Sequence, residues 1–418
     1  MKSFRCRLPV RTRGRAPLVS IVACGLVLSG CAFDGSATES NPELKQVDVA
    51  AMTATLHDTI EELLVPGALA LIQTPAGTYT VSAGTTAMGD DIPPAVADQF
   101  RIGSVTKTMT VAAVLQLIQE GKIGVDDPID KYVLGVPDGS EITIAQLMMS
   151  MRSGLHNYLD TDGFRAAFGA DPTKIWAPSE LLALGFSQPS GFAPGTQFDY
   201  SNTNTVLLGL VVEKSGGQVP RAGVHRPVLR SARPDPYRAS RRDRHDPLGA
   251  VLARISVRSA TGLGQADDAR GDRGGESRVP ATQRCDGDEP LVGLGAGGVV
   301  SSADDLMTWI KAFVGGDLLD DANQQLWWDS IRIQHEEDPR VFYGYGITEV
   351  RFGENRLTYH EGQLPGFNTM AVHDEANDVS MVIWTNLSVT QDVDNAFTVM
   401  ARLLQHIYNT PADTPPAR

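Results

Sequence analysis

Cysteine is scarce in this chain of 418 residues, which contains four. Cys6 and Cys24 lie in an N-terminal segment with the features of a removable leader, Cys31 ends a motif for lipid attachment, and Cys285 is left alone. No disulfide framework is therefore available, and we expect core packing to stabilise the protein. Its 42% share of hydrophobic residues supplies enough material for a large core, in one or two domains.

The sequence also lacks an apolar run long enough to span a bilayer as a permanent helix. Residues 1–17 are basic and residues 18–28 form an eleven-residue apolar run, which is typical of a signal peptide. The next residues, LSGC ending at Cys31, resemble the lipobox of bacterial lipoproteins, in which cleavage precedes a lipidated cysteine. We predict a signal peptide over 1–30, a tether over 31–46 and a lipid-anchored protein of the bacterial cell envelope. An ordinary signal peptide with a chance cysteine is the alternative.

Lysine is absent from the most basic part of the chain, and aromatic residues are rare there. Residues 221–284 hold fourteen Arg, no Lys and seven Asp or Glu, a local charge of +7 (14 − 7), within a chain of net charge -14. Such a stripe can bind phosphate. Residues 228–250 nevertheless contain Pro234, Pro236 and Pro247, a single aromatic residue for bases to stack on, and no helical apolar period. We therefore predict no nucleic-acid binding.

Several catalytic signatures are missing. No serine lies in a G-x-S-x-G elbow, no H-E-x-x-H is found, and no G-x-G-x-x-G opens a helix after a strand. His335 beside Glu336 and Glu337 is a possible metal-ligating group, but such a run is more typical of a solvated surface. We predict neither a metal nor a cofactor.

Apolar periodicity predicts strands near both ends of the domain and helices between them. The predicted strands form hairpins over 67–84 and over 367–373 with 379–386, and the predicted helices cover 104–121, 179–186, 201–217 and 301–313. A capping pattern from Ser302 to Asp305 opens the last helix. The predicted fold class is α/β: an antiparallel sheet flanked by helices with an inserted helical domain, over residues 47–410, followed by a tail at 411–418.

Three short motifs hold residues that could carry out acyl transfer: SVTK at 104–107, YSN at 200–202 and HEG at 360–362. With eight Lys in the chain, a lone Ser-x-x-Lys is expected on the order of once by chance. If Ser104 lies in the first turn of a helix, Lys107 lies on the same face one turn above it. A serine hydroxyl needs a neighbouring base to become a good nucleophile. Lys107 and Tyr200 can supply it, because a cation beside a phenol lowers the phenol's pKa.

The order of these motifs and the sequences around them, FRIGSVTKTMT, FDYSNTNTVLLGLVVEK and YHEGQLPGFNTM, resemble the class C β-lactamase and D-alanyl-D-alanine carboxypeptidase family of penicillin-recognising serine enzymes. The resemblance covers about residues 50–217 and 296–405. It implies that Ser104 is the acylated nucleophile and that Lys107 and Tyr200 transfer its proton. It also implies that the backbone N–H groups of Ser104 and Gln363 form the oxyanion hole.

The resemblance further implies that Asn202 contacts the substrate amide and that His360 stands where many relatives have Lys. The substrate-binding residues that it implies are Asn202, His360, Gly362 and Gln363. Glu361 departs from the Thr or Ser usual at this position. A carboxylate there would repel the terminal carboxylate of a D-Ala-D-Ala substrate if it faced the cleft, so an esterase remains an alternative.

The resemblance stops between about Gln218 and Gly295, a stretch that includes the arginine-rich segment. Arginine and proline crowd together when GC-rich DNA is read out of frame. Advanced by one nucleotide, residues 229–235 can encode FDPLGLT, residues 253–259 HGYQYG and residues 289–295 NPSWAW, which resemble phrases of the family. We predict that residues 219–295 are a frameshifted, poorly ordered translation, which resequencing across codons 215–300 would test.

Two hypotheses for function follow. The first is a serine hydrolase acting through an acyl-enzyme, foremost a D-alanyl-D-alanine carboxypeptidase on peptidoglycan stem peptides, with a class C-like β-lactamase or an esterase as alternatives. The second is a catalytically inactive envelope-binding protein, because the frameshifted segment removes part of the cleft wall. Covalent labelling by a fluorescent penicillin, lost in Ser104→Ala, would separate the two.

Overall fold

The computed structural model describes residues 44–149, 152–172, 174–216, 296–335, 338–390 and 393–409, with side chains undescribed over 334–341 and 389–394. The predictions for the signal peptide, Cys31, most of the tether, the segment 219–295 and the tail lie outside the described residues. The side chains of His335, Glu336 and Glu337 also lie outside the described part of the chain. In the described part of the chain, no helix is both long and apolar enough to cross a membrane.

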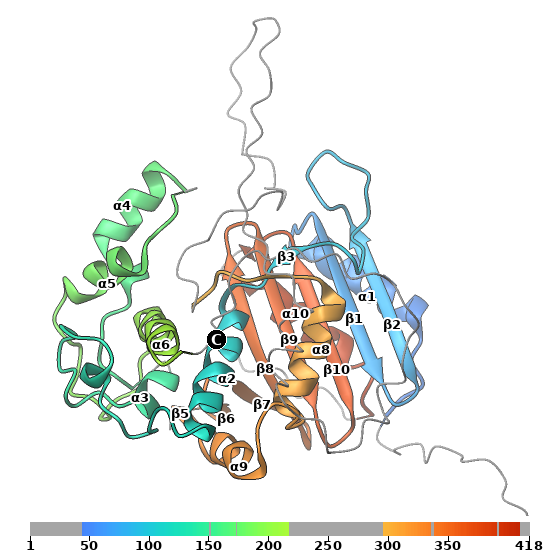
Figure 1. Cartoon of the computed structure of the whole chain (residues 1–418). Helices are drawn as coiled ribbons and strands as arrows, with labels where there is room; N and C mark the ends of the chain where they lie inside the picture. Colours follow the sequence, from blue (N-terminus) through green and yellow to red (C-terminus); the bar gives the residue numbers. More distant parts are fainter. Residues whose placement is uncertain are drawn as a thin grey trace, which may run out of the picture. The chain divides into compact units, whose positions relative to one another are not determined.

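An antiparallel sheet of eight strands forms the centre of the described fold (Figure 1). Its strand order is β2-β1-β10-β9-β8-β7-β6-β5, so strands from both ends of the chain lie side by side. The strands are β1 (Gly67–Thr74), β2 (Gly77–Gly84), β5 (Arg332–His335), β6 (Asp338–Tyr343), β7 (Thr348–Phe352), β8 (Asn355–Leu364), β9 (Phe367–Asp374) and β10 (Val379–Thr385).

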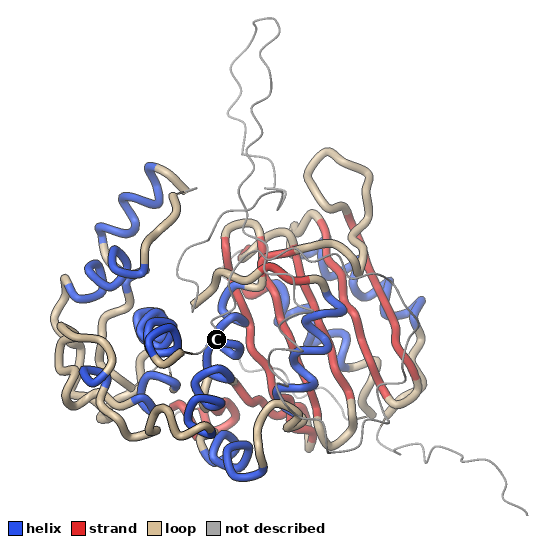
Figure 2. Tube along the Cα trace, in the orientation of Figure 1, coloured by secondary structure: helices blue, strands red, loops and turns tan. Residues whose placement is uncertain are grey.

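Helices cover both faces of this sheet (Figure 2). On β1, Leu69 and Leu71 join the core under α2 (Thr106–Gln119) and α8 (Ala303–Val314). The alternate residues Ala70 and Ile72 join the core under α1 (Val49–Glu62) and α10 (Asn395–Leu404). This division follows from the two-residue period of a strand. It explains why β9 is buried along its whole length.

A helical region is inserted between two short strands, β3 (Phe100–Arg101) and β4 (Val300–Ser301), which pair with each other. In it, α2, α3 and α5 contact α6. In the described part of this region, the α-helices after α2 are α3 (Ile144–Met148), α4 (Asp162–Ala170), α5 (Pro178–Phe186) and α6 (Asn202–Lys214). The predicted α/β class, with an antiparallel sheet, flanking helices and a helical insertion, is confirmed.

Both predicted hairpins and the four predicted helices are present, and Ser302 caps α8 by accepting the N–H of Asp305. The sequence interpretation missed β5 to β8. It also missed α1, α10 and α9 (Asp321–Asp329), although Asp48 and Asp320 cap the first turns of α1 and α9. The third motif therefore lies on a central strand, β8, and not in a loop.

Candidate active site

Ser104 lies in a 3-10 turn, η1 (Gly103–Val105), which leads directly into α2. Gly103 makes this turn possible because its φ of 51° lies in the left-handed region, and a Cβ there would meet the backbone N of Gln363 at 2.8 Å. The glycine thus lets the turn press against β8. It presents Ser104, which is half-buried, at the start of α2.

Lys107 is fully buried one turn after Ser104. Its Nζ lies 2.7 Å from Ser104 Oγ, 2.7 Å from Asn202 Oδ1 and 2.8 Å from the carbonyl oxygen of Ala296. Three segments far apart in the sequence therefore meet at one nitrogen. The predicted proximity of Ser104 and Lys107 on one helical face is confirmed.

The three contacts of Lys107 suit both of its protonation states. Burial lowers the pKa of Lys107 well below its ordinary value of 10.5, which favours the neutral amine. A neutral amine donates two N–H groups, to Asn202 and Ala296, and directs its lone pair at Ser104. An ammonium group donates all three N–H groups to the same three oxygens. Lys107 can therefore accept the Ser104 proton without losing a hydrogen bond.

Tyr200 Oη lies 3.2 Å from Ser104 Oγ, and Lys107 Nζ lies 5.1 Å from the centre of the tyrosine ring. The expected lowering of the Tyr200 pKa is wrong. Desolvation raises the pKa of this phenol well above its ordinary value of 10.0, and the neighbouring Tyr343 raises it further. A neutral Lys107 offers no charge to oppose these effects. These directions favour a phenol that keeps its proton at Tyr200 and a neutral amine at Lys107.

Asn202 is the first residue of α6, and its side chain is turned toward Lys107. Its backbone N and its Nδ2 both lie 3.2 Å from Asn157 Oδ1. The structure thus brings Asn202 to the nucleophile, as the motifs predicted, but through Lys107. Whether it contacts a substrate amide stays a prediction.

His360 is buried on β8, with 3% of its surface exposed. Its Nδ1 lies 2.7 Å from the carbonyl oxygen of Glu361, so Nδ1 carries the proton and donates it. Nε2 is then the acceptor, and Tyr343 Oη lies 3.4 Å away. Burial, with a smaller contribution from Lys107, lowers the pKa of His360 to about 3. At neutral pH this ring is therefore uncharged.

The backbone of β8 runs directly against the nucleophile turn. A Cβ on Gly362 would lie 1.9 Å from the carbonyl oxygen of Ile102 and 2.7 Å from the backbone N of Ser104, so only glycine fits there. The backbone N of Gln363 lies at the same contact, beside Gly103. The amide groups of Ser104 and Gln363 are therefore neighbours, which the predicted oxyanion hole requires.

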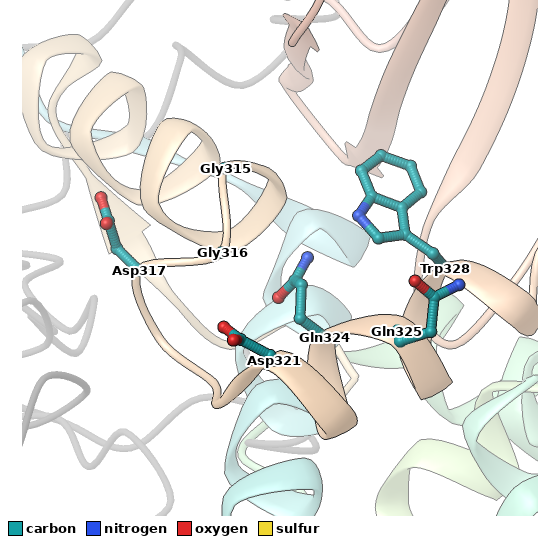
Figure 3. Close-up of a pocket in the computed structure, with 7 residues that line it drawn as sticks. All are labelled: Gly315, Gly316, Asp317, Asp321, Gln324, Gln325 and Trp328. Carbon is teal, nitrogen blue, oxygen red and sulfur yellow. The ribbon is translucent and has the colours of Figure 1, made fainter.

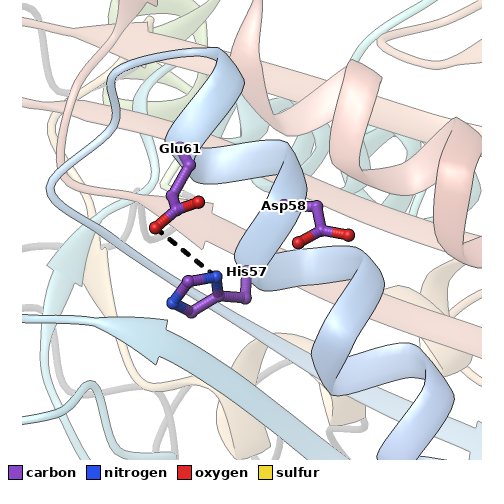
Figure 4. A group of neighbouring side chains, drawn as sticks. All are labelled: His57, Asp58 and Glu61. Atoms are coloured by element: carbon purple, nitrogen blue, oxygen red, sulfur yellow. Dashed lines mark ion pairs between the residues drawn. The ribbon is translucent and has the colours of Figure 1, made fainter.

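A cluster of possible metal ligands, His57, Asp58 and Glu61, lies on α1, far in the sequence from the three motifs (Figure 4). All three residues are exposed, and His57 Nδ1 lies 3.7 Å from a Glu61 carboxylate oxygen in an i,i+4 pair. Such pairs are common on exposed helix faces and contribute little to stability. The cluster gives no reason to revise the prediction that no metal is used.

A polar pocket of about 510 Å³ lies where α8 passes into α9 (Figure 3). Its wall contains none of the residues of the three motifs. The lining residues are Gly315, Gly316, Asp317, Asp321, Gln324, Gln325 and Trp328. It is therefore separate from the chemistry around Ser104.

Three contributors to the site escaped the sequence interpretation: Asn157, Tyr343 and the carbonyl group of Ala296. Each belongs to no short motif, and each contacts a motif residue 17 to 189 positions away. A polar residue in a loop, as Asn157 is in HNYLD, gives no periodic signal. Only the tertiary fold reveals these contacts.

Comparison with known proteins agrees with this geometry. The family model described as Beta-lactamase matches residues 56–405. The chain is 24% identical over 356 residues to penicillin-binding protein 4* of Bacillus subtilis (strain 168), in an alignment covering 81% of this chain and 71% of that protein. It is 24% identical over 253 residues to the D-alanyl-D-alanine-carboxypeptidase/endopeptidase AmpH of Escherichia coli (strain K12), covering 58% of this chain and 56% of AmpH.

Among solved structures, a D-stereospecific amidohydrolase from Streptomyces sp. superposes with a TM-score of 0.65 at 25% sequence identity. This superposition covers 87% of the present chain and 100% of the amidohydrolase. The matched proteins thus share the fold while their names describe different reactions.

Proposed function

The chain belongs to the beta-lactamase family of serine hydrolases, and from this premise we propose that it cleaves peptides through an acyl-enzyme on Ser104. D-alanyl-D-alanine carboxypeptidase on peptidoglycan stem peptides is the first candidate activity. The observation that carries the proposal is the contact of Lys107 with Ser104, Asn202 and Ala296, which suits the amine and the ammonium alike. The likeness to penicillin-binding protein 4* and AmpH supports it.

In the proposed reaction, the neutral amine of Lys107 takes the proton of Ser104 as Oγ attacks the substrate carbonyl. The backbone N–H groups of Ser104 and Gln363 hold the oxyanion. As the intermediate collapses, Tyr200 donates its phenolic proton to the leaving amine, and the Lys107 ammonium returns a proton to Tyr200. Water then enters in place of the amine and attacks the acyl carbonyl while Lys107 takes its proton. Lys107 passes this proton to Ser104 Oγ as the acyl C–O bond breaks, which releases the acid and restores the serine hydroxyl and the neutral amine.

A second candidate is an amidase or esterase whose substrate lacks a terminal carboxylate. The observation that favours it is the uncharged state of His360, whose pKa burial lowers to about 3. A D-Ala-D-Ala terminus is anionic, and His360 supplies no positive charge to bind it. The name of the Streptomyces amidohydrolase is in keeping with this alternative.

A labelling experiment tests the acyl-enzyme itself. Incubation of the purified chain with a fluorescent penicillin should attach the dye covalently, and Ser104→Ala should abolish the attachment. Failure of the folded protein to react with penicillins, peptides and esters alike would leave the second hypothesis, an inactive envelope-binding protein.

A matched pair of substrates separates the two candidate activities. One is an N-acylated peptide ending in D-Ala-D-Ala, and the other is the same peptide with its terminal carboxylate converted to an amide. A carboxypeptidase should prefer the first by kcat/KM, and an amidase should prefer the second. The outcome assigns the substrate class whichever way it falls.

For location, we propose lipid anchoring at Cys31, supported by the basic leader, the short apolar run and the LSGC motif. Cys31→Ser should block lipid attachment, so that precursor accumulates or is cut elsewhere. Normal processing and membrane retention of this variant would contradict the proposal.

A further inference from the structure

We propose that Asn157 is a positioning residue for the reaction at Ser104: it fixes the orientation of the Asn202 amide and thereby holds Lys107 aimed at the nucleophile. The Asn157 side chain donates to Asp160 and accepts from Asn202, and Asn202 in turn contacts Lys107, so Asn157 acts through Asn202. This proposal rests on the proposed function, but its central measurement does not require turnover.

The orientation of the Asn157 amide is determined by its neighbour Asp160. Asn157 Nδ2 lies 2.8 Å from a carboxylate oxygen of Asp160, and a carboxylate accepts hydrogen bonds without donating them. The amide nitrogen of Asn157 must therefore face Asp160. Its Oδ1 consequently faces Asn202, where it accepts from the backbone N and from Nδ2, each at 3.2 Å.

The same argument then determines the orientation of the Asn202 side-chain amide. Because Asn157 Oδ1 only accepts, Asn202 must turn Nδ2 toward it and leave Oδ1 for Lys107 Nζ, 2.7 Å away. A reversed Asn202 amide would place its oxygen against the Asn157 oxygen and its N–H groups against Nζ. Each step from Asp160 to Lys107 thus has a single allowed direction of donation.

This direction matters for the chemistry because Lys107 has three partners for one lone pair and two N–H groups. While Asn202 Oδ1 and the Ala296 carbonyl group accept the two N–H groups, the lone pair can point only at Ser104. If Asn202 were free to turn, one N–H group would lose its acceptor and the lone pair would no longer be restricted to the nucleophile. Among the described residues, the titratable side chains facing Lys107 are Tyr200 and His360.

A purely structural role for Asn157 would be to hold its loop against α6. Thr203 offers a matched control, since its Oγ1 accepts the N–H of Tyr158 and donates to the carbonyl oxygen of His156 without contacting the Asn202 side chain. Thr203→Val should loosen the same loop while leaving the orientation of the Asn202 amide to Asn157.

The decisive measurement is the pKa of Lys107, followed by NMR with 13C-labelled lysine in the full chain, where the eight lysines give few signals. Asn157→Leu should lower the Lys107 pKa further, because the ammonium loses an acceptor. The double variant Asn157→Asp with Asp160→Asn keeps an acceptor toward Asn202 and moves a carboxylate closer to Lys107, so it should raise this pKa. Thr203→Val should leave it unchanged.

Acylation by a fluorescent penicillin supplies the second readout. Asn157→Leu should slow it roughly 10- to 100-fold, part of the effect of a positioned proton transfer, whereas the double variant should recover most of the rate at alkaline pH. Melting temperatures identify any variant that fails to fold. Equal Lys107 pKa values in wild type, Asn157→Leu and the double variant would overturn the proposal. Absence of acylation in wild type would instead refute the proposed function.

Discussion

Two buried polar clusters in this protein resemble each other in composition and differ in the protonation states that they accommodate. The catalytic cluster consists of Ser104, Lys107, Asn157, Tyr200 and Asn202. The Asp374 cluster consists of Asn355, Asp374, Asn377 and Tyr408. Both hold an ionisable group that is fully buried and joined to amide and phenol side chains.

In the Asp374 cluster, every neighbour of the carboxylate is a donor. Asp374 accepts from Tyr408 Oη at 2.8 Å, from Asn377 Nδ2 at 2.7 Å and from the backbone N of Asn377 at 3.2 Å. This arrangement suits the ionised state, and the Tyr408 pKa is raised, chiefly by burial. Lys107, in contrast, keeps all its hydrogen bonds with or without its proton. A cluster suited to one protonation state stabilises a fold, whereas one suited to two can pass a proton.

The largest expected effect follows from removing the Lys107 amine, whose hydrogen bonds are satisfied both with and without its proton. Lys107→Met should reduce the second-order rate constant for penicillin acylation by roughly 10³-fold or more, because Ser104 loses its base. The measurement is the rate of fluorescent labelling. As a control, Asp374→Ala should label at close to the wild-type rate once corrected for the folded fraction. Comparable losses in both variants would remove the distinction between the clusters.

The next effect concerns stability. Asp374→Ala should lower the free energy of unfolding by about 2–4 kcal/mol, since Tyr408 and Asn377 lose a buried acceptor at roughly 1–3 kcal/mol per unsatisfied group. Urea denaturation followed by tryptophan fluorescence measures it. If this variant unfolds at the wild-type urea concentration, the Asp374 cluster has no structural role of the kind described.

The pH dependence of acylation gives a third, smaller effect. Because the reactive form of Lys107 is the neutral amine, the rate constant should rise about tenfold per pH unit below the Lys107 pKa and level off above it. Since burial lowers this pKa, the plateau should begin well below pH 10.5. Stopped-flow labelling between pH 5 and pH 10 provides the profile. A rise that continues without levelling off to pH 10 would mean that Lys107 is not desolvated in solution.

The smallest expected effect is at the edge of the catalytic cluster. Tyr343→Phe removes the hydroxyl group 3.4 Å from His360 Nε2 but keeps the ring that packs edge-on against Phe198. A long hydrogen bond of this kind should change kcat/KM by about threefold or less, because its net contribution lies at the lower end, about 0.5 kcal/mol, of the range for ordinary hydrogen bonds. A loss above tenfold would place Tyr343 among the residues that transfer protons.

Local motifs predicted the chemistry of the site better than its electrostatics. Ser104 and Lys107 could be placed together from their spacing on one helix, and Tyr200 from the resemblance of its motif. The direction of the Tyr200 pKa could not, because it depends on burial and on the charge of Lys107, neither of which a sequence pattern contains. Asn157 and Ala296 escaped for a related reason, since their contacts with Asn202 and Lys107 cross 45 and 189 positions.

For the fold, too, local elements could be predicted from the sequence, whereas features that depend on long-range contacts could not. Hairpins and helices with clear periodicity, such as 67–84 and α8, were predicted within a few residues. The strands β5 to β8 were not predicted, although β8 alternates polar and apolar residues from Arg356 to His360. Their order in the sheet follows from long-range pairing, which short-range patterns do not contain.

The pairing of β3 with β4 bears on how this gene can change. The helical insertion begins and ends at paired strands of a separate two-stranded sheet, so its length can vary without moving either strand. Lys107, however, takes a carbonyl group from Ala296, just before β4. Because this partner is a main-chain oxygen, what the insertion must preserve is the path by which the chain returns to β4, and not the side chain at position 296.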